Sequence, residues 1–369
     1  MAGTSDLRPQ TSDLRPQTSD LRPQTSDLRP QTSDLRPSMK KIAWLGCAHI
    51  HTPHFTELVK NEPAVEVVGV WDHDSERAAK TAEKLGTPVI RNLATVWNDS
   101  SIGAVIICSE TDRHAELIIP AAQAGKDIYA EKPIGCHAED ARKMAAAVAQ
   151  AGVRFHTGYF RRGLPIDLFV KKLIDEGTLG KITRVRYNNC HSGSLGGWFD
   201  TDWRWMADPV QAGCGAFGDL GTHVLDIVMW WLGQPEQVTA DVEVVTGRYG
   251  DCDETGEALL RFPNGTLATL SAAWVDCACP VTLTVSGTEG HVTVMNDQLY
   301  LTCEKLGADG SQPWTALPPA EPAGFPLFLE YLAGRQNAEK LVTVQEAAAR
   351  NIVMDALYQA AATHSWIRI

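Results

Sequence analysis

The sequence predicts an α/β fold in two parts: a doubly wound parallel sheet, then an α+β part whose open sheet is mainly antiparallel. Between residues 41 and 157, short apolar runs alternate with helical stretches, which is the pattern of right-handed βαβ units. After residue 157 the pattern changes, and from Val238 to Cys303 strand-like runs follow one another without helices between them, as antiparallel strands do. Asn264-Gly265, between two of these runs, is a strong hairpin signal.

The first part contains five expected strands and four expected helices. Thr52-Pro53 supplies an N-cap and a proline at the start of the first helix, and Gly86 and Gly125 follow the second and third helices. Near-continuous apolar runs such as VEVVGVWD indicate strands that helices cover on both faces. The expected strands are 41–47, 65–72, 104–108, 127–130 and 153–157, and the expected helices are 52–61, 75–85, 112–124 and 138–151.

The second part begins with a helix and ends with two helices after a Pro-rich connection at 313–326. Its sheet is expected to pack on one face against helices and to leave the other face open. Open faces often become subunit interfaces, so we expect a homodimer or homotetramer. The expected helices are 165–176, 219–232, 325–335 and 343–363, and the expected strands are 182–190, 238–246, 257–262, 266–275, 281–287, 291–295 and 299–303.

Residues 1–38 differ from the rest of the chain. TSDLRPQ occurs four times from Thr4 to Gln31, with leucine as its only apolar residue. A segment of this kind cannot bury a core. We interpret residues 1–38 as an engineered, disordered repeat tag, Met39 as the natural start, and 39–157 and 158–369 as two domains.

Composition limits the possible functions. The chain of 369 residues is 44% hydrophobic and 21% charged, with a net charge of −12. The acidic balance argues against nucleic acid and anionic membranes as partners.

The apolar run Val224 to Leu232 is far shorter than the roughly 20 residues of a membrane span. Nine scattered cysteines without a CxxC pair predict reduced thiols and no zinc site. The apolar run from Ile42 to Cys47 stops at His49 without an A-x-A cleavage pattern, so we expect a cytoplasmic protein.

The loop after the first strand, Gly46-Cys47-Ala48-His49-Ile50-His51, stands where a Rossmann fold places G-x-G-x-x-G. Glycines let the backbone approach a pyrophosphate at a helix N-terminus. Only the first glycine is present, Ala48 still permits a fairly close approach, and His51 replaces the third glycine. Asp72 lies 26 positions after Gly46, at the end of the second strand. A carboxylate there accepts ribose hydroxyls and favours NAD over NADP.

The same loop supports a rival hypothesis. His49, His51 and His54 resemble the H-x-H with which barrel-type metal-dependent hydrolases begin a metal site. That hypothesis requires eight βα units, which the antiparallel second half does not provide.

Two further features carry chemistry. Lys132 follows the fourth expected strand, at the edge where open α/β sheets bind ligands. Asp219 and His223 are four residues apart and therefore lie on one helix face. A solvated lysine, and an aspartate N-cap with an incidental histidine, are the alternatives. Glycines crowd the approach to this helix, at positions 213, 215, 218 and 221.

Together these segments resemble the Gfo/Idh/MocA oxidoreductase family over essentially all of 39–369. The most specific part is Glu131-Lys132-Pro133 combined with the later Asp219-x-x-x-His223. Further matching segments are Lys41 to Cys47, Ile102 to Ser109, His114 to Leu117, Ala124 to Ile134, Gly180 to Ile182 and Gly215 to His223.

The resemblance implies an NAD(P)-binding Rossmann domain at 39–157 and a substrate-binding and oligomerisation domain at 158–369. It implies hydride transfer between NAD and a secondary alcohol of a sugar, sugar derivative or cyclitol, with Lys132 as the catalytic lysine and Asp219 and His223 as its partners. Either Lys132 or His223 could be the base. Cofactor contacts are expected from Gly46, Ala48, His49, Ile50, Asp72, Ser109, His114, Glu131 and Lys132.

Substrate contacts are expected around the catalytic residues. The loop Gly196 to Met206 is rich in tryptophan, whose ring faces stack on sugars. The expected substrate-binding residues are Tyr159, Arg161, His191, Trp203, Arg204, Asp219 and His223.

Two other functions stay open. One is glycoside cleavage through transient oxidation, elimination and re-reduction, with Tyr159, His156 or His191 as an additional acid or base. The other is a non-catalytic sensor of nucleotide or sugar.

Overall fold

The computed structural model describes residues 39–369, so the predicted tag at 1–38 lies outside the described residues. The first sheet is parallel throughout, with strand order β2-β1-β3-β4-β5. The chain order reverses between β1 and β3, and open α/β sheets bind ligands at such a switch point. The strands are β1 (Lys40–Leu45), β2 (Val65–Trp71), β3 (Ile102–Ile107), β4 (Asp127–Ala130) and β5 (Phe155–Thr157).

Both faces of this sheet are buried, as the apolar runs predicted. In β1, Ile42 and Trp44 point to one face and Ala43 and Leu45 to the other. Helices α1 (Thr52–Lys60) and α9 (Phe325–Leu332) cover the Trp44 face. Helices α4 (His114–Gln123) and α5 (Ala138–Ala151) cover the Leu45 face. Helix α2 (Ser75–Leu85) flanks β2, and α3 (Ala94–Trp97) was not predicted.

The second sheet has nine strands in the order β13-β12-β11-β10-β6-β9-β8-β7-β14. It is antiparallel except for the pair β6 and β9, which is parallel. The strands are β6 (Ile182–Cys190), β7 (Gln237–Glu243), β8 (Thr255–Arg261), β9 (Leu267–Ala273), β10 (Val281–Gly287), β11 (Gly290–Met295), β12 (Gln298–Cys303), β13 (Ala308–Pro313) and β14 (Ile367–Arg368). The last two were missed by the sequence analysis.

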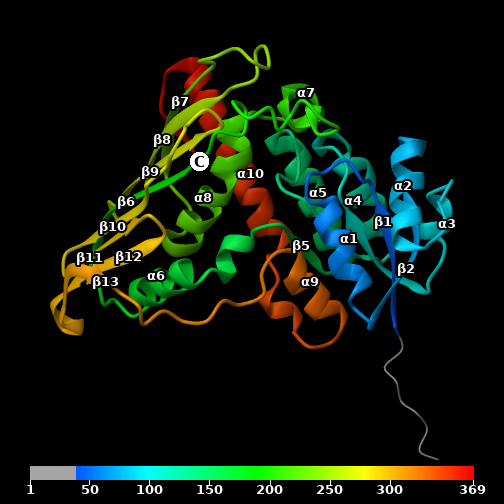
Figure 1. The fold of residues 1–369 in the computed structure, drawn as a ribbon, viewed down its shortest axis with the longest axis horizontal. Helices are drawn as coiled ribbons and strands as arrows, with labels where there is room; N and C mark the ends of the chain where they lie inside the picture. Colours follow the sequence, from blue (N-terminus) through cyan, green and yellow to red (C-terminus); the bar gives the residue numbers. More distant parts are fainter. Residues whose placement is uncertain (1–38) are drawn as a thin grey trace, which may run out of the picture. The chain divides into compact units, whose positions relative to one another are not determined.

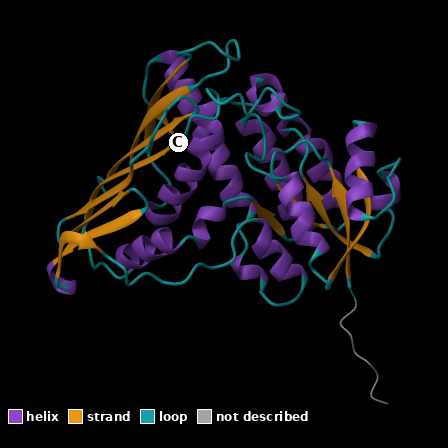
Figure 2. Ribbon diagram, viewed as in Figure 1, coloured by secondary structure: helices purple, strands orange, loops and turns teal. Residues whose placement is uncertain are grey.

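One face of this sheet packs on helices and the other is open (Figure 2). Helices α6 (Pro165–Asp175), α8 (Ala216–Leu232) and α10 (Val344–Thr363) share its apolar core. In Figure 1, α8 and α10 lie between the two sheets. Along β6, Val185 and Tyr187 are buried and Arg184 and Arg186 are exposed, as the predicted open face requires.

Two expectations about the second half need correction. Helix α8 begins at Ala216 and not at 219, so Asp219 lies inside the helix and is not its N-cap. Helix α9, which the sequence analysis assigned to the second domain, packs its Phe325 and Phe328 on the first sheet. The domain boundary at 157 stays a prediction.

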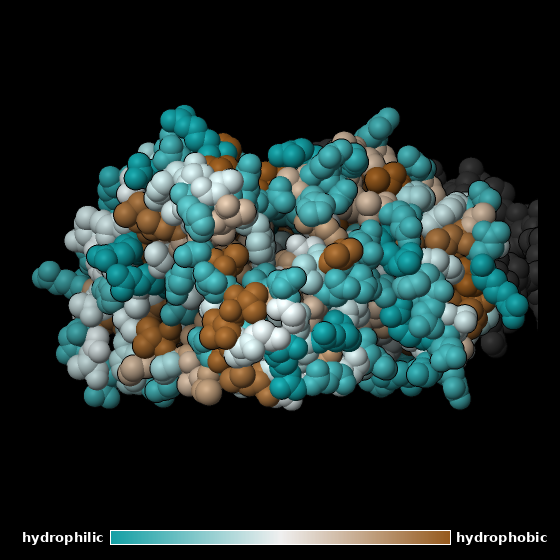
Figure 3. Space-filling model, turned by 90° about the horizontal axis from the view of Figure 1, so that it is seen from above, coloured by the Kyte–Doolittle hydropathy of each residue, from teal (hydrophilic) through white to brown (hydrophobic). Residues whose placement is uncertain are grey.

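The surface and the helices show two further features. Within residues 39–369, every helix is too short or too polar to cross a membrane. On the face seen in Figure 3, hydrophobic residues form small groups between hydrophilic ones.

Candidate active site

A buried ion pair joins the two parts of the chain. Lys132 follows β4 and is 4% exposed, and its Nζ lies 2.6 Å from Oδ1 of Asp219 on α8. Burial opposes the charge of each group, but the opposite charge and the hydrogen bond outweigh it, raising the pKa of Lys132 and lowering the pKa of Asp219. The Trp274 indole donates to the second carboxylate oxygen at 3.3 Å. Both partners are therefore charged at neutral pH.

His223 lies one turn along α8 from Asp219 and is buried. Burial, and then the positive charge of Lys132, hold the pKa of His223 well below its usual range. Its Nδ1 is buried without a hydrogen-bond partner among residues 39–369. Phe160 packs edge-on against the ring, with centroids 5.0 Å apart. The imidazole is thus neutral, and no protein group among residues 39–369 occupies its Nδ1.

The start of α8, the helix that carries Asp219 and His223, is capped by a residue that is distant in the sequence. The Asp253 carboxylate accepts hydrogen bonds from Gly215 N at 2.9 Å and Phe217 N at 2.8 Å. Its backbone carbonyl accepts from Ala216 N, and the Tyr358 hydroxyl accepts from Gly218 N at 2.8 Å. This network satisfies four N–H groups that a helix start otherwise leaves unpaired. Sequence reasoning missed Asp253, because only tertiary contact brings it to α8.

We expect Asp253→Ala to lower the free energy of unfolding by about 1–3 kcal/mol, because a cap and the partners of buried N–H groups are lost together. Urea unfolding measures this loss. Asp208→Ala is the control, since Asp208 caps only the four-residue helix α7 (Pro209–Ala212) and should cost less. An equal loss in the two variants would contradict the anchoring role of Asp253.

The loop between β1 and α1 has the geometry of an anion cradle. Gly46 has φ +80°, and a Cβ there would lie 2.5 Å from Ser109 backbone atoms, so glycine is required. The N–H groups of Ala48 and Ile50 have no acceptor among residues 39–369. These free donors at the switch point suit a pyrophosphate. A cavity of about 450 Å³ opens beside them, lined by Cys47, Ala48, Thr52, Pro53, Thr56, Arg77, Lys80, Thr81, Lys84, Thr201, Asp202 and Trp203.

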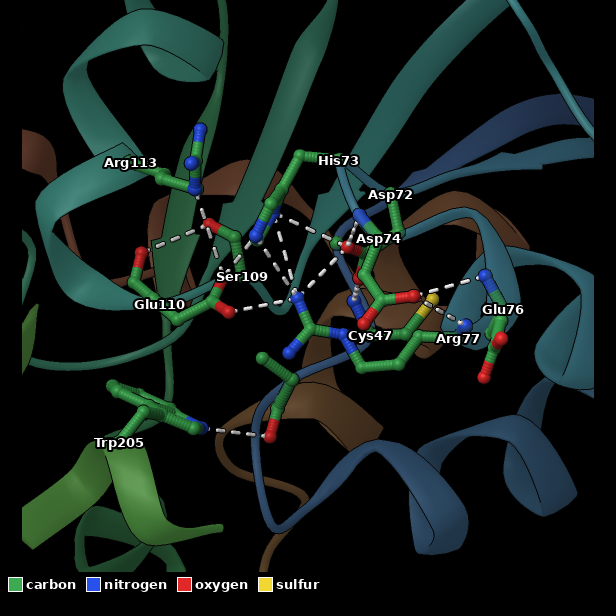
Figure 4. A network of polar contacts seen from close by, with 12 residues as sticks. Cys47, Asp72, His73, Asp74, Glu76, Arg77, Ser109, Glu110, Arg113 and Trp205 are labelled. Carbon is green, nitrogen blue, oxygen red and sulfur yellow. Dashed lines mark hydrogen bonds and ion pairs between the residues drawn. The ribbon is translucent and has the colours of Figure 1, made fainter. Parts of the chain in front are cut away.

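Asp72 stands at the end of β2, next to this loop (Figure 4). Its Oδ2 accepts from Cys47 N at 2.6 Å, and its Oδ1 accepts from Asp74 N at 2.8 Å and from Arg77 at 2.9 Å. The carboxylate is therefore fixed in place, where a ribose diol would meet it. The residues present fit a dinucleotide.

His49 and His51, in the loop after β1, lie beside Glu131, which is fully buried. His51 Nδ1 lies 3.3 Å and His49 Nε2 lies 3.7 Å from its two oxygens. The three ligand atoms lie within 4.8 Å of one another, close enough for a metal ion. However, Glu131 already accepts hydrogen bonds from the Tyr129 hydroxyl and from Lys132 N. The open five-stranded sheet also excludes the barrel that the hydrolase hypothesis required, so that hypothesis is wrong.

His49 connects the cofactor loop to the ion pair. It lines a small pocket together with Lys132, Asp219 and Trp205. Burial lowers the pKa of His49 to about 3. The Trp205 indole donates to the Ala48 carbonyl at 3.0 Å, which fixes the tryptophan-rich loop over the cofactor loop. Of the other expected cofactor residues, His114 is buried beneath the turn at Ile134, with Nδ1 3.3 Å from its carbonyl.

The expected substrate residues separate into different places. Arg161 donates to the Tyr187 hydroxyl at 2.6 and 3.0 Å and lines a cavity of about 580 Å³ with Asn189 and Cys190. The Tyr159 hydroxyl, 3.2 Å from Thr222 Oγ1, is buried behind His223. Both residues lie beside α8, and their contact with a substrate stays a prediction.

Three other expected substrate residues have partners of their own. Trp203 lines the cavity beside the cofactor loop and not the cavity at Arg161. Arg204 stacks on the Tyr249 ring, 4.5 Å from its centroid, because the aromatic face attracts the guanidinium. His191 packs on Trp198 with ring centroids 4.8 Å apart, and its Nδ1 accepts from Gly193 N.

His156, one of the residues considered as an additional acid or base, belongs to the core. Its Nδ1 accepts from Val342 N at 2.8 Å, and its ring stacks on Phe328. Burial lowers its pKa to about 3. Its side chain is held by the C-terminal segment, so it does not serve the site.

The burial of His156 predicts how the stability of the protein depends on pH. Between pH 6.5 and about 3 the unfolded chain binds a proton at His156 that the folded chain does not, so stability falls as the pH drops through this window. His156→Asn keeps an acceptor for Val342 N–H and should flatten the decline by up to about 1.4 kcal/mol per pH unit. Urea unfolding from pH 7 to 4 measures it. An unchanged slope would mean that His156 is not held neutral, and exposed His137→Asn is the control.

Comparisons with known proteins agree with this architecture. Residues 40–159 match a family model described as oxidoreductase family, NAD-binding Rossmann fold. Residues 168–293 match the model of the GFO/IDH/MocA C-terminal domain. A solved levoglucosan dehydrogenase, in complex with NADH and levoglucosan, has a TM-score of 0.75 and 23% sequence identity, covering 90% of this chain and 100% of that one.

Two curated relatives show the range of activities. Myo-inositol 2-dehydrogenase of Thermotoga maritima is 29% identical over 241 residues, which cover 62% of this chain and 67% of that protein. The 2,7-anhydro-N-acetylneuraminate hydratase of Mediterraneibacter gnavus is 27% identical over 282 residues, which cover 69% of this chain and 73% of that protein. These alignments span about two thirds to three quarters of the relatives' own length.

Proposed function

Because the chain belongs to the Gfo/Idh/MocA family of NAD-binding oxidoreductases, we propose that it is an NAD-dependent dehydrogenase of a sugar, sugar derivative or cyclitol. The observation that carries this proposal is the buried pair of Lys132 and Asp219, with neutral His223 one turn further along α8. The dehydrogenases of inositol and levoglucosan among its relatives support the substrate class.

The residues present divide the chemistry among them. When bound, NAD accepts or returns the hydride at its nicotinamide. The alcohol that gives up a hydride must also lose its hydroxyl proton, which requires a base within hydrogen-bond reach. His223, neutral and with free acceptor capacity, takes that proton. Lys132 is charged, so it donates to the same oxygen and stabilises its negative charge. Asp219 holds the Lys132 ammonium in position.

The loop after β1 and Asp72 would hold the cofactor. The free N–H groups of Ala48 and Ile50 suit the pyrophosphate, and the Asp72 carboxylate suits the adenosine ribose. The non-catalytic sensor rested on the missing loop glycines, and these free donors remove that support.

Calorimetry with NAD, followed by a panel of sugars and cyclitols assayed for NADH, tests the proposal. We expect NAD to bind and at least one polyol to give NADH. Absence of binding at millimolar NAD would overturn it.

A second candidate is a redox-neutral route in which the sugar is oxidised, loses or gains a group, and is reduced again. The hydratase among the relatives favours it. His191, whose ring is half-buried near Asp219, is the available additional acid or base. Product formation without NADH accumulation in the same panel would select this route.

The open face of the second sheet suits a homodimer or homotetramer, and the chain's acidic charge and reduced thiols suit the cytoplasm. Light scattering of the purified protein measures its oligomeric state.

The cofactor assignment makes a direct prediction. Asp72→Ala should weaken the binding of NAD by about tenfold or more, because a hydrogen bond to a charged group contributes about 1.5–3 kcal/mol. The affinity for NADP should fall less, since the same carboxylate repels the 2′-phosphate of NADP. Calorimetric dissociation constants for both cofactors measure the difference. An equal loss for both would refute this role of Asp72.

A further inference from the structure

Arg77 is held between two carboxylates at the adenosine end of the predicted cofactor site (Figure 4). It lies in the first turn of α2, and one of its terminal nitrogens donates to Asp72 Oδ1 at 2.9 Å and to Glu110 Oε1 at 2.7 Å. Glu110 follows β3 and is 3% exposed. Two strand ends on either side of β1 therefore contribute one carboxylate each to the same guanidinium.

The surroundings of Arg77 are acidic. Asp74, the N-cap of α2, accepts from the backbone N–H groups of Glu76 and Arg77. The other nearby guanidinium, Arg113, lies 4.0 Å from Glu110 and only 2.8 Å from Glu116. Partial burial works against the charge of Arg77, but Asp72 and Glu110 outweigh it and raise the pKa of the guanidinium. Arg77 is thus permanently charged and outnumbered by carboxylates.

This arrangement bears on cofactor choice. NADP differs from NAD by a phosphate on the ribose 2′-oxygen, and a nearby arginine is the usual way to accommodate it. Arg77 has the right charge, position and access, since it lines the cavity beside Cys47 and Ala48. Both of its carboxylate partners, however, compete with a phosphate for the same guanidinium.

We propose that Glu110 is a specificity-determining residue, which together with Asp72 keeps Arg77 in ion pairs and so excludes the 2′-phosphate of NADP. The inference rests on the proposed binding of NAD and deepens it. Asp72 has other hydrogen-bond donors, Cys47 N and Asp74 N. Glu110 has no comparable set: its second oxygen, Oε2, is buried without a hydrogen-bond partner among residues 39–369. The His73 imidazole lies 3.7 Å and the Arg113 guanidinium 4.0 Å from that oxygen. Arg77, hydrogen-bonded at 2.7 Å, is therefore the main compensation for the buried charge of Glu110.

Glu110→Gln tests this directly, because the amide keeps the shape and removes the charge. Calorimetry with NAD and NADP should show the NADP-to-NAD affinity ratio rising by about tenfold or more, with NAD itself changing less than about threefold. Glu110→Gln/Arg77→Ala should lose that gain, because the freed guanidinium supplies it. Glu116→Gln is the matched control: Glu116 is exposed, pairs with Arg113 and does not contact Arg77.

Three outcomes overturn the inference: an unchanged ratio in Glu110→Gln, a gain that persists in the double variant, or a wild-type protein that binds NADP as tightly as NAD. The last outcome is measured on the wild-type protein, so it does not depend on the folding of a variant. Glu110→Ala is a second variant that lacks the Glu110 charge. Failure of the wild-type protein to bind either cofactor would instead overturn the proposed function, so the two failures are distinguishable.

Discussion

Lys132→Met should lower kcat by roughly a hundredfold or more while leaving NAD affinity little changed. The variant removes the ammonium that stabilises charge on the reacting oxygen, and one such contact is typically this large. It also leaves the partly buried Asp219 carboxylate without its partner, which lies at 2.6 Å in the wild type, and this should cost about 1–3 kcal/mol of stability. Steady-state kinetics and thermal unfolding measure the two effects on the same samples.

A double variant separates the two effects. Lys132→Met/Asp219→Asn removes both charges, so it should recover most of the lost stability and none of the lost turnover. Lys143→Met/Glu139→Gln is a matched control, since that pair has an N···O distance of 2.7 Å but is exposed on α5 and should affect neither. If turnover per folded molecule stays intact in Lys132→Met, the lysine is structural and the proposed site is wrong.

The sequence predicted elements well where their ends are encoded locally. Five elements have the predicted bounds, namely α2, β4, α5, β6 and β10. Gly152 illustrates the reason: it ends α5 in the left-handed conformation, at φ +68°, which glycine adopts without strain. Gly86 ends α2 in the same way. A terminating residue within the segment is visible to sequence reasoning.

Prediction failed where the terminating group is distant in the chain. Helix α8 starts three residues earlier than predicted, because the Asp253 carboxylate binds its first N–H groups from 36 and 38 residues away. The bond from the Trp205 indole to Ala48 spans 157 residues, and the contact between Arg77 and Glu110 spans 33. The expected contact of Trp203 with a substrate stays a prediction: its type suggests stacking on a sugar, and the fold places it in the cavity beside the cofactor loop.

The proposed catalytic residues could be named from the sequence for two reasons: local spacing places Asp219 beside His223, and the family resemblance joins them to Lys132, 87 residues away. Asp219 and His223 share a helix face at any helix start, and Lys132 follows a strand end in a parallel sheet. The protonation states were not accessible. The charge of Lys132 and the neutrality of His223 follow from burial and from the 2.6 Å ion pair, and they are the basis for proposing His223 as the base.

His223→Ala is therefore expected to lower kcat by roughly a hundredfold or more. Combined with Lys132→Met, it should lower kcat little further. The base removes the hydroxyl proton and the ammonium stabilises the oxygen that results, so neither contributes fully without the other. The double variant should then be about as slow as the slower single variant, since groups acting as a unit give strongly non-additive losses. Kinetics of the four proteins under one set of conditions measure the coupling.

The control for the histidine change is His137→Ala, whose side chain is 73% exposed and whose loss should leave kcat unchanged. The pH profile supplies a second readout. His223 is held neutral by burial and by the charge of Lys132, so Lys132→Met should raise the pKa of His223 and move the acid limb of kcat/KM to higher pH, because a charge that opposed protonation is gone. If the two single losses multiply in the double variant and the acid limb does not move, Lys132 and His223 act on separate steps and the division of roles proposed for them is incorrect.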